Sequence, residues 1–266
     1  MIQFLQIFIL GISLGGVYAL MASGLTLIFG VMRIVNLAHA AFIIIAAYIA
    51  YGLFATWGVD PLLSVLATMP IMFFFGVLVY RVLFARLTES ARFVDSTVLI
   101  TFALALVIEG VLGYFFSGIY RSTNPPYVTD TLHFGPFYFP EGQFYATVFS
   151  FIILVGLWAF LRFSRIGYAI RATMQNRMAA KTVGVNVEQI SLITFGLGSA
   201  LAGASGSLVA FLFTFVPAKH WEWIAILMAL IVLGGLGSLL GSLVGALVLS
   251  VAAAFIGFYF GPTWSP

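Results

Sequence analysis

The sequence contains no cysteine, so disulfide bonds, thiolate metal ligands and a cysteine nucleophile are excluded. Charged residues are also scarce: they make up 7% of the 266 residues, whereas a soluble globular protein carries about 25%. With 63% hydrophobic residues, a soluble fold of this length could not keep its surface polar. The composition therefore indicates an integral membrane protein. A net charge of +3 is too small a bias to indicate nucleic-acid binding.

Eight apolar segments approach the roughly 20 residues that a membrane-crossing helix needs. They are Phe4–Phe29, Leu37–Thr56, Leu62–Tyr80, Ser96–Ser117, Phe144–Leu161, Ile190–Val216, Trp223–Leu239 and Ser242–Phe260. The first lacks the positive start and short apolar core of a signal peptide, so we interpret it as a retained span. The expected fold is an all-α integral membrane protein, a polytopic bundle of about eight helices that forms one domain over residues 1–266.

The last two spans are separated only by glycines, because no charged residue follows Trp223. A re-entrant pair of half-helices is an alternative for this region, since irregular backbone is tolerated in a membrane where protein surrounds it.

The basic residues predict the orientation of the bundle, because cytoplasmic loops are enriched in Lys and Arg. When alternate loops are placed on opposite sides, nine basic residues fall on one side and two, Arg121 and Lys219, on the other. The nine are Arg33, Arg81, Arg86, Arg92, Arg162, Arg165, Arg171, Arg177 and Lys181. This asymmetry places the larger set in the cytoplasm and the N-terminus outside.

Two connecting loops are long. Gly118–Gln143, rich in Pro, Gly and aromatic residues, is expected to form an ordered external cap. Arg162–Gln189 is expected in the cytoplasm, where Tyr168–Gly184 predicts one amphipathic helix that ends at its glycine. Its apolar face would carry Ile170, Met174 and Met178.

The sequence carries no recognisable catalytic set. Its three histidines lie in different segments without metal-ligand spacing, and neither lysine belongs to a phosphate-binding loop. The chain is therefore not expected to be an enzyme, and ATP-driven transport would need a separate ATPase.

A few polar residues interrupt the apolar spans. Asn36 and His39, three residues apart at the start of the second span, share a helix face and either line a substrate path or serve as a helix cap and a packing hydrogen bond. The predicted path also includes Tyr18, Ser23 and Thr26. Glu109 is either a proton or substrate site, or an interfacial side chain that reaches water or Arg121.

Small residues recur every four positions in several spans, a spacing that lets helices approach closely in lipid. The rows are Gly237, Gly241 and Gly245, then Ser199 and Gly203, Ala202 and Gly206, and Gly11 and Gly15. They indicate either packing within one subunit or a dimer interface.

Three segments together resemble the permease subunits of branched-chain amino acid ABC importers. GGVYALMASGLTLIFGVMRIVNLAHAAF resembles that family's first-span signature, with Ala40 where glycine is usual, and LIVLGGLGSLLGSLVGAL resembles its late glycine-rich signature. The segment from Met178 to Gly184 resembles the E-A-A-x-x-x-G loop that docks on the ATPase, with Met178 in place of glutamate. The final GPTWSP resembles the approach to a further span.

The resemblance implies an importer of the bacterial or archaeal plasma membrane. Its other parts would be a second permease subunit, two cytoplasmic ATPases that hold ATP and Mg²⁺, and an external solute-binding protein. The residues implied for ATPase coupling are Ile170, Arg171, Met174, Met178, Ala179, Ala180 and Gly184. The implied cargo is a branched-chain or other hydrophobic amino acid, with urea, short amides or aromatic acids as alternatives. A transporter that works without ATP remains a second hypothesis.

Overall fold

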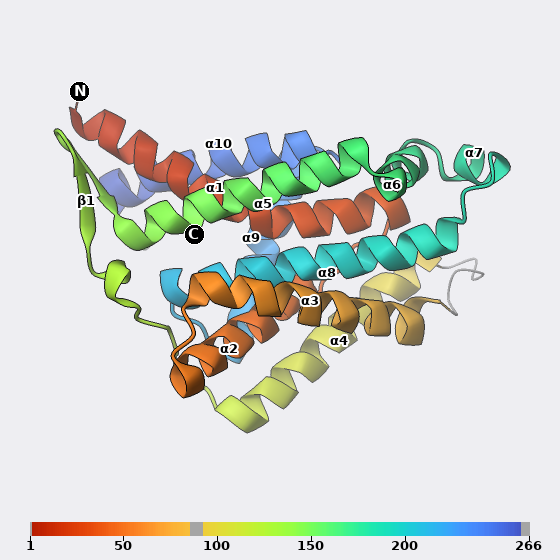
Figure 1. Ribbon diagram of the computed structural model, residues 1–266, viewed down its shortest axis with the longest axis horizontal. Coiled ribbons are helices and arrows are strands. Elements are labelled where there is room, and N and C mark those ends of the chain that lie inside the picture. The colour runs from red at the N-terminus through yellow and green to blue at the C-terminus, as the bar shows by residue number, and fades with distance from the viewer. Residues whose placement is uncertain (1, 86–92, 262–266) are drawn as a thin grey trace.

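The apolar runs form helices, because a backbone surrounded by lipid must bond its N–H and C=O groups internally. The computed structural model describes residues 2–85 and 93–261 (Figure 1). The long helices are α1 (Ile2–Met32), α2 (His39–Trp57), α3 (Pro61–Val79), α4 (Phe93–Phe116), α5 (Glu141–Phe163), α8 (Val187–Leu212) and α10 (Leu239–Phe260). The shorter elements are η1 (Tyr80–Phe84), η2 (Pro126–Val128), β1 (Thr131–Phe134), β2 (Phe137–Pro140), α6 (Arg165–Gln175), α7 (Arg177–Thr182), η3 (Pro217–Lys219) and α9 (His220–Leu233).

Local capping residues set several helix boundaries. Asp60 accepts a hydrogen bond from the Leu62 amide (2.8 Å) and precedes Pro61, so α3 begins there. Asn186 and Ser238 cap α8 and α10 in the same way. At the other end of α2, Gly58 adopts φ +66° and ends the helix. The loops between α1, α2 and α3 are consequently short.

Seven of the described helices are long and apolar enough to cross a membrane. α9 is the exception: its 14 residues extend about 21 Å, less than the roughly 30 Å hydrocarbon core. The predicted helical span Trp223–Leu239 is therefore wrong in extent, because the chain leaves the helix after Leu233 and Gly235 and Gly237 adopt positive φ. α10 is a full-length helix, so this region is one short and one complete helix.

Between α8 and α10 the chain still passes from one end of the bundle to the other. α9 begins beside the C-terminal half of α4, where Trp221 bonds Glu109. The segment after α9 reaches the opposite end, where a Cβ on Gly237 would lie 3.2 Å from the Gly30 Cα. α9 and this segment thus take the place of the seventh of the eight predicted crossings.

α8 is the most buried of the membrane-length helices and packs against α1, α2 and α3. Its small residues allow this contact: a Cβ on Gly203 would lie 2.6 Å from the Thr68 oxygen of α3. Ser207 of α8 also exchanges hydrogen bonds with Ser64 (3.1 Å) and Thr68 (2.8 Å) of α3. The small-residue rows of α8 therefore pack against other helices of the same subunit.

The other small-residue rows also pack internally. Gly11 and Gly15 face α10, where a Cβ on Gly11 would approach the Val251 Cα to 2.8 Å. Gly241 and Gly245 face the end of α9. The prediction of one helical row is wrong for Gly237, which precedes α10 with φ +84°.

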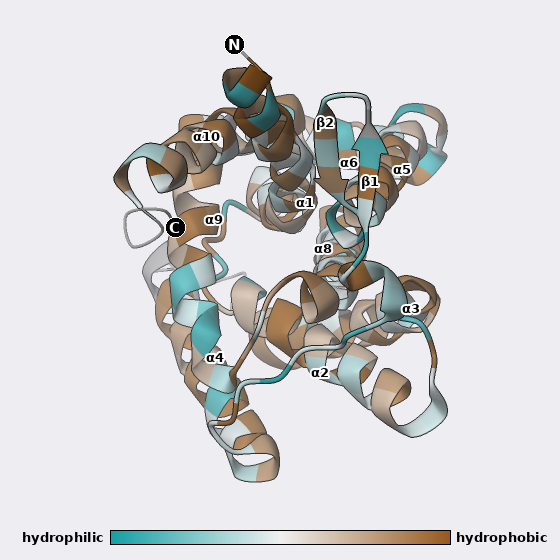
Figure 2. Ribbon diagram, turned by 90° about the vertical axis from the view of Figure 1, so that its left-hand side faces the viewer, coloured by the Kyte–Doolittle hydropathy of each residue, from teal (hydrophilic) through white to brown (hydrophobic). Residues whose placement is uncertain are grey.

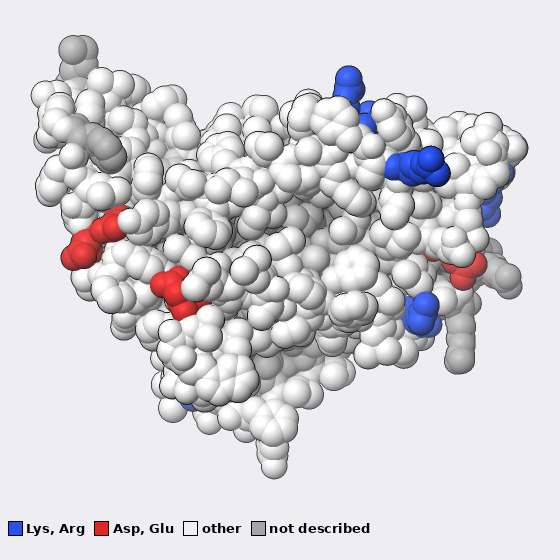
Figure 3. Space-filling view, viewed as in Figure 1, with Lys and Arg blue, Asp and Glu red and all other residues white. Residues whose placement is uncertain are grey.

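On the face shown in Figure 3, the charged side chains of the described residues gather toward the two ends of the bundle. We call one the basic end: α1, α3 and α5 finish there, and α6 and α7 lie beyond it (Figure 1). The opposite hairpin end carries β1 and β2, which pair antiparallel. Figure 2 looks onto the hairpin end and shows mainly hydrophobic residues around the bundle.

Candidate translocation path and coupling segment

The predicted path residues lie inside the subunit. Tyr18, Ser23 and Thr26 are buried on α1. His39 of α2 is also buried and packs beside Gly24 of α1. The His39 Nε2 lies 3.1 Å from the Met21 carbonyl oxygen, which is the packing hydrogen bond considered for this residue. His39 of α2 therefore meets α1 within the stretch that carries the other predicted residues.

Asn36 precedes α2 and closes the turn between α1 and α2. Its Oδ1 accepts a hydrogen bond from the Ala38 amide at 3.2 Å, while its backbone oxygen accepts one from the His39 amide. Its Nδ2 is buried without a hydrogen-bond partner in the described part of the chain. The Asn36 side chain therefore has a structural bond through Oδ1 and an amide nitrogen whose two N–H donors are unused among the described residues.

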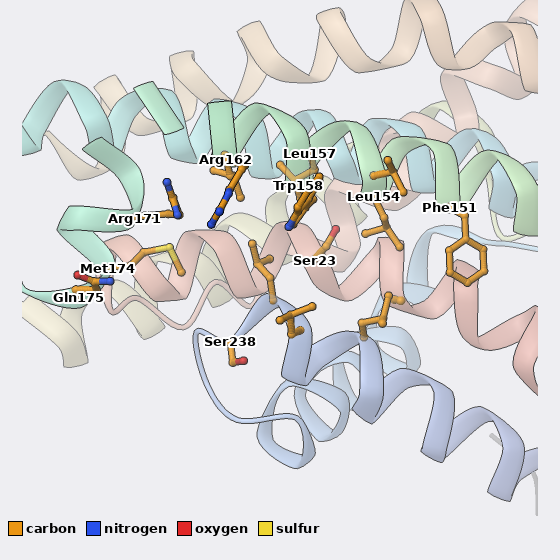
Figure 4. A pocket seen from close by; sticks show the side chains of 16 residues that line it. Ser23, Phe151, Leu154, Leu157, Trp158, Arg162, Arg171, Met174, Gln175 and Ser238 are labelled. Carbon is orange, nitrogen blue, oxygen red and sulfur yellow. The ribbon is translucent and has the colours of Figure 1, made fainter. Parts of the chain in front are cut away.

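A cavity of about 760 Å³ lies between α1, α5, α6 and α10 (Figure 4). Ser23 is the predicted path residue that lines it. Most of the wall is apolar, and polar groups concentrate toward the basic end, where Arg162, Arg171 and Gln175 lie. This cavity could not be predicted from the sequence, because its walls come from helices far apart along the chain.

The segment between α5 and α8 is two helices. The prediction of a single helix over Tyr168–Gly184 is wrong, because Asn176 (φ −154°, ψ 105°) leaves the helical region and caps α7. Its Oδ1 accepts hydrogen bonds from the amides of Met178 and Ala179, both at 3.0 Å. A side chain that bonds nearby amides competes with the continuous helix.

The break separates the residues expected on one apolar face. Ile170 is fully buried, and Met174 packs against Gly30 of α1, so both turn inward. Met178 on α7 is 72% exposed, whereas Ala180 is 3% exposed and packs inward. The prediction that these residues form one apolar docking face is therefore wrong. The residues of α7 that are exposed to solvent include Met178, Ala179 and Lys181.

Gly184 ends α7 as predicted. It adopts φ +87°, its amide bonds the Lys181 oxygen, and the Val185 amide bonds the Ala180 oxygen at 3.0 Å. This pair of bonds is a Schellman motif, which needs a residue in the left-handed conformation. The motif turns the chain back toward α8.

Glu109 belongs to a polar cluster at the hairpin end. Its Oε2 accepts a hydrogen bond from the Trp221 Nε1 at 2.9 Å and lies 3.5 Å from the His220 Nε2. Arg121, the partner considered from the sequence, instead donates to the Tyr51 hydroxyl at 3.1 Å. Glu109 thus joins α4 to α9.

The loop 118–143 is ordered, as expected. The hairpin is fixed to α1 by Gln6, whose side chain bonds both the Tyr138 oxygen (2.6 Å) and its amide (3.1 Å). Tyr127 donates to Asp60 at 2.9 Å, and burial together with this carboxylate raises the pKa of the Tyr127 phenol, so it stays a donor. The hairpin end therefore presents a defined surface.

Membrane-length helices beside a mainly apolar cavity, with short helices projecting beyond one end, form a polytopic membrane protein. The family model described as branched-chain amino acid transport system, permease component, matches residues 7–265. The chain belongs to this family of transport permeases and is a multi-pass protein of the plasma membrane.

Several curated relatives agree along most of the chain. The probable branched-chain amino acid transport permease LivH of Methanocaldococcus jannaschii is 30% identical over 90% of this chain and 77% of its own length. BraD of Pseudomonas aeruginosa, a high-affinity branched-chain amino acid permease, is 27% identical over 97% of this chain and 88% of its own. LivH of Escherichia coli K12 is 26% identical, with 97% and 87% covered. No solved structure matches the chain.

Proposed function

We propose that this chain is one permease subunit of an ATP-driven importer and forms part of the translocation path for branched-chain or other hydrophobic amino acids. A solute-binding protein would deliver the cargo to the hairpin end. A second permease subunit and two ATPases that hold ATP and Mg²⁺ would complete the importer. The relatives named for this cargo support the cargo class.

The observation that carries the ATP-driven part of the proposal is α7, a capped helix that presents exposed residues beyond the basic end of the bundle. Short helices bind grooves of partner proteins through exposed apolar anchors. Met178 is the proposed anchor, Ala179 permits close approach, and Lys181 and Arg177 contribute weaker ion pairs of about 0–1 kcal/mol each. Ile170, Arg171, Met174, Ala180 and Gly184 support α6 and α7 in position.

The test is Met178→Asp in the assembled importer. A charge placed in a desolvated apolar contact should cost about 2 kcal/mol or more, which is about a 30-fold loss of ATPase binding. Co-purification of the ATPases and ATP-driven uptake into proteoliposomes measure the loss. Unchanged co-purification and unchanged uptake would contradict docking through α7, and uptake without any ATPase would support the ATP-independent hypothesis.

Gln189→Asp is the matched control. It adds the same charge to the same loop, at an exposed position in the first turn of α8. An acidic residue there is favourable to the helix dipole, so ATPase binding and uptake should stay at wild-type values.

A role for the buried polar residues in transport is tested by Thr26→Val. The Thr26 hydroxyl is buried and has no hydrogen-bond partner in the described part of the chain, so its removal costs the fold little. If it bonds the cargo during transport, uptake should fall about tenfold, the equivalent of one hydrogen bond of about 1.4 kcal/mol. Unchanged uptake would make Thr26 a packing residue.

Thr194→Val is the control for Thr26→Val, because Thr194 of α8 is also buried with an unbonded hydroxyl and lies outside the predicted path. Its uptake should match that of the unaltered chain. Asn36→Leu should also lower uptake, but it removes the bond to the Ala38 amide as well, so thermal unfolding must be measured beside it.

A further inference from the structure

The cavity between α1, α5, α6 and α10 extends over one half of the membrane. Along α5 it runs from Phe151 to Arg162, a distance of about 16 Å at 1.5 Å per residue. Half of the hydrocarbon core is about 15 Å deep. The cavity therefore extends from the basic end to the middle of the bilayer, as the acyl chain of a single leaflet does.

The cavity is open at the side of the bundle. Val155 and Trp158 of α5 and Leu240 of α10 belong to its lining, and all three side chains are largely exposed. Figure 4 shows Phe151, Leu154 and Leu157 following one another along the α5 wall. A molecule in the surrounding lipid can thus enter from the membrane.

The end of the cavity at the basic end is positively charged. Arg162 and Arg171 lie close together there (Figure 4). In residues 2–85 and 93–261 the carboxylates within ion-pair distance of a basic side chain are Glu222, beside Lys219, and Glu109, beside His220, so neither arginine has a described carboxylate partner. The Nε of Arg171 is also buried and has no hydrogen-bond partner in the part of the chain that the structure describes, and the guanidinium carbon of Arg171 lies 4.8 Å from the centre of the Tyr168 ring.

We propose that this cavity binds an anionic phospholipid of the cytoplasmic leaflet, with its phosphate between Arg162 and Arg171 and one acyl chain along α5 and α10. Basic pockets between membrane helices on the cytoplasmic side suit lipid headgroups, and guanidinium groups match phosphate geometry. The volume of about 760 Å³ is in the range of small-molecule sites. The proposal does not depend on the cargo or the ATPase.

The lining chemistry separates a lipid from the transported amino acid. Among the described residues, the lining contains two arginines and no acidic side chain, so the ammonium group of an amino acid would face positive charge. An anionic amphiphile meets both the charged end and the apolar wall. Once bound, the lipid would connect α5, α6 and α10 beside Met174, which packs on α1.

The test is lipid binding to the full chain, measured by native mass spectrometry in detergent. Phosphatidylglycerol should bind at one site and more tightly than phosphatidylcholine with the same acyl chains, while glycerol phosphate without chains should not bind. The double variant Arg162→Gln/Arg171→Gln should weaken phosphatidylglycerol by about tenfold for each lost charged bond. Arg162→Lys/Arg171→Lys should retain most of the affinity.

Arg165→Gln/Arg177→Gln is the matched control, because it removes two charges from the same segment at positions that do not line the cavity. It should bind phosphatidylglycerol like the unaltered chain. Equal binding of the two lipids, or unchanged affinity in the Arg162→Gln/Arg171→Gln variant, would overturn the proposal. Loss of the lipid when the second permease subunit assembles would also overturn it and assign the cavity to the subunit interface.

Discussion

At the scale of single residues, close backbone approach decides where side chains are tolerated. α8 is surrounded by α1, α2 and α3, and Gly198, Gly203 and Gly206 lie where a Cβ would meet backbone atoms of a neighbour. In α5, which is mostly exposed, a Cβ on Gly156 would meet nothing within 4 Å. Replacing a glycine by a larger residue is therefore expected to have different effects in α8 and in α5.

Gly203→Ala should destabilise the bundle. The new Cβ would lie 2.6 Å from the Thr68 backbone oxygen and 3.0 Å from the Met72 Cβ, so α3 and α8 must separate. Overpacking of this kind costs about 1–3 kcal/mol, which thermal unfolding in detergent should show as a lower melting temperature. Gly156→Ala is the control and should leave stability unchanged or improved, since alanine favours a helix. Equal melting temperatures for the two variants would contradict the packing.

At the scale of elements, α7 depends on its two ends. Six residues are too few for a stable isolated helix. Asn176 satisfies two amides at its start, and the Schellman motif at Gly184 satisfies two carbonyls at its end. The exposed position of Met178 therefore rests on these caps.

Asn176→Ala should loosen α7 without affecting the membrane helices. Loss of an N-cap costs about 1 kcal/mol, so the amides of Met178 and Ala179 should exchange hydrogen several times faster. Asn176→Asp retains an acceptor at the cap and should keep the exchange slow. If Asn176→Ala exchanges at the wild-type rate, the cap does not hold the helix.

At the scale of the whole molecule, the bundle has two chemically different ends. The ends of α1, α3 and α5 and the helices α6 and α7 bring seven described basic residues to one end, while Arg121 and Lys219 lie at the other. Arg86 and Arg92, which were counted with the larger set, lie outside the described residues, as does most of GPTWSP. The positive-inside tendency then predicts a cytoplasmic basic end.

Cysteine labelling in intact cells tests this orientation, and the native chain has no cysteine to interfere. Thr182→Cys on exposed α7 should react with a membrane-impermeant reagent only after the cells are opened. Asp130→Cys in the exposed loop before β1 should react from outside. Labelling of Thr182→Cys in intact cells would reverse the topology.

The membrane class and the positions of the crossings could be predicted from the amino-acid sequence alone. An apolar run in lipid must form a helix whatever its neighbours are, and all but one of the predicted spans correspond to full-length helices. The helix end at Gly184 could also be predicted from the sequence, because the left-handed conformation that ends the helix is a local requirement. The family resemblance likewise rested on contiguous motifs.

Which helix faces contact one another depends on the packing of the whole bundle. The sequence predicts that Ile170, Met174 and Met178 share one apolar helix face. In the structure, contacts with the bundle turn Ile170 and Met174 inward and leave Met178 exposed. The partner of Glu109 is Trp221, 112 positions away. The cavity at Arg162 and Arg171 is built from four helices, and neither arginine has a carboxylate partner among the described residues. Hydrophobic periodicity acts within one element, whereas these features depend on how separate elements pack.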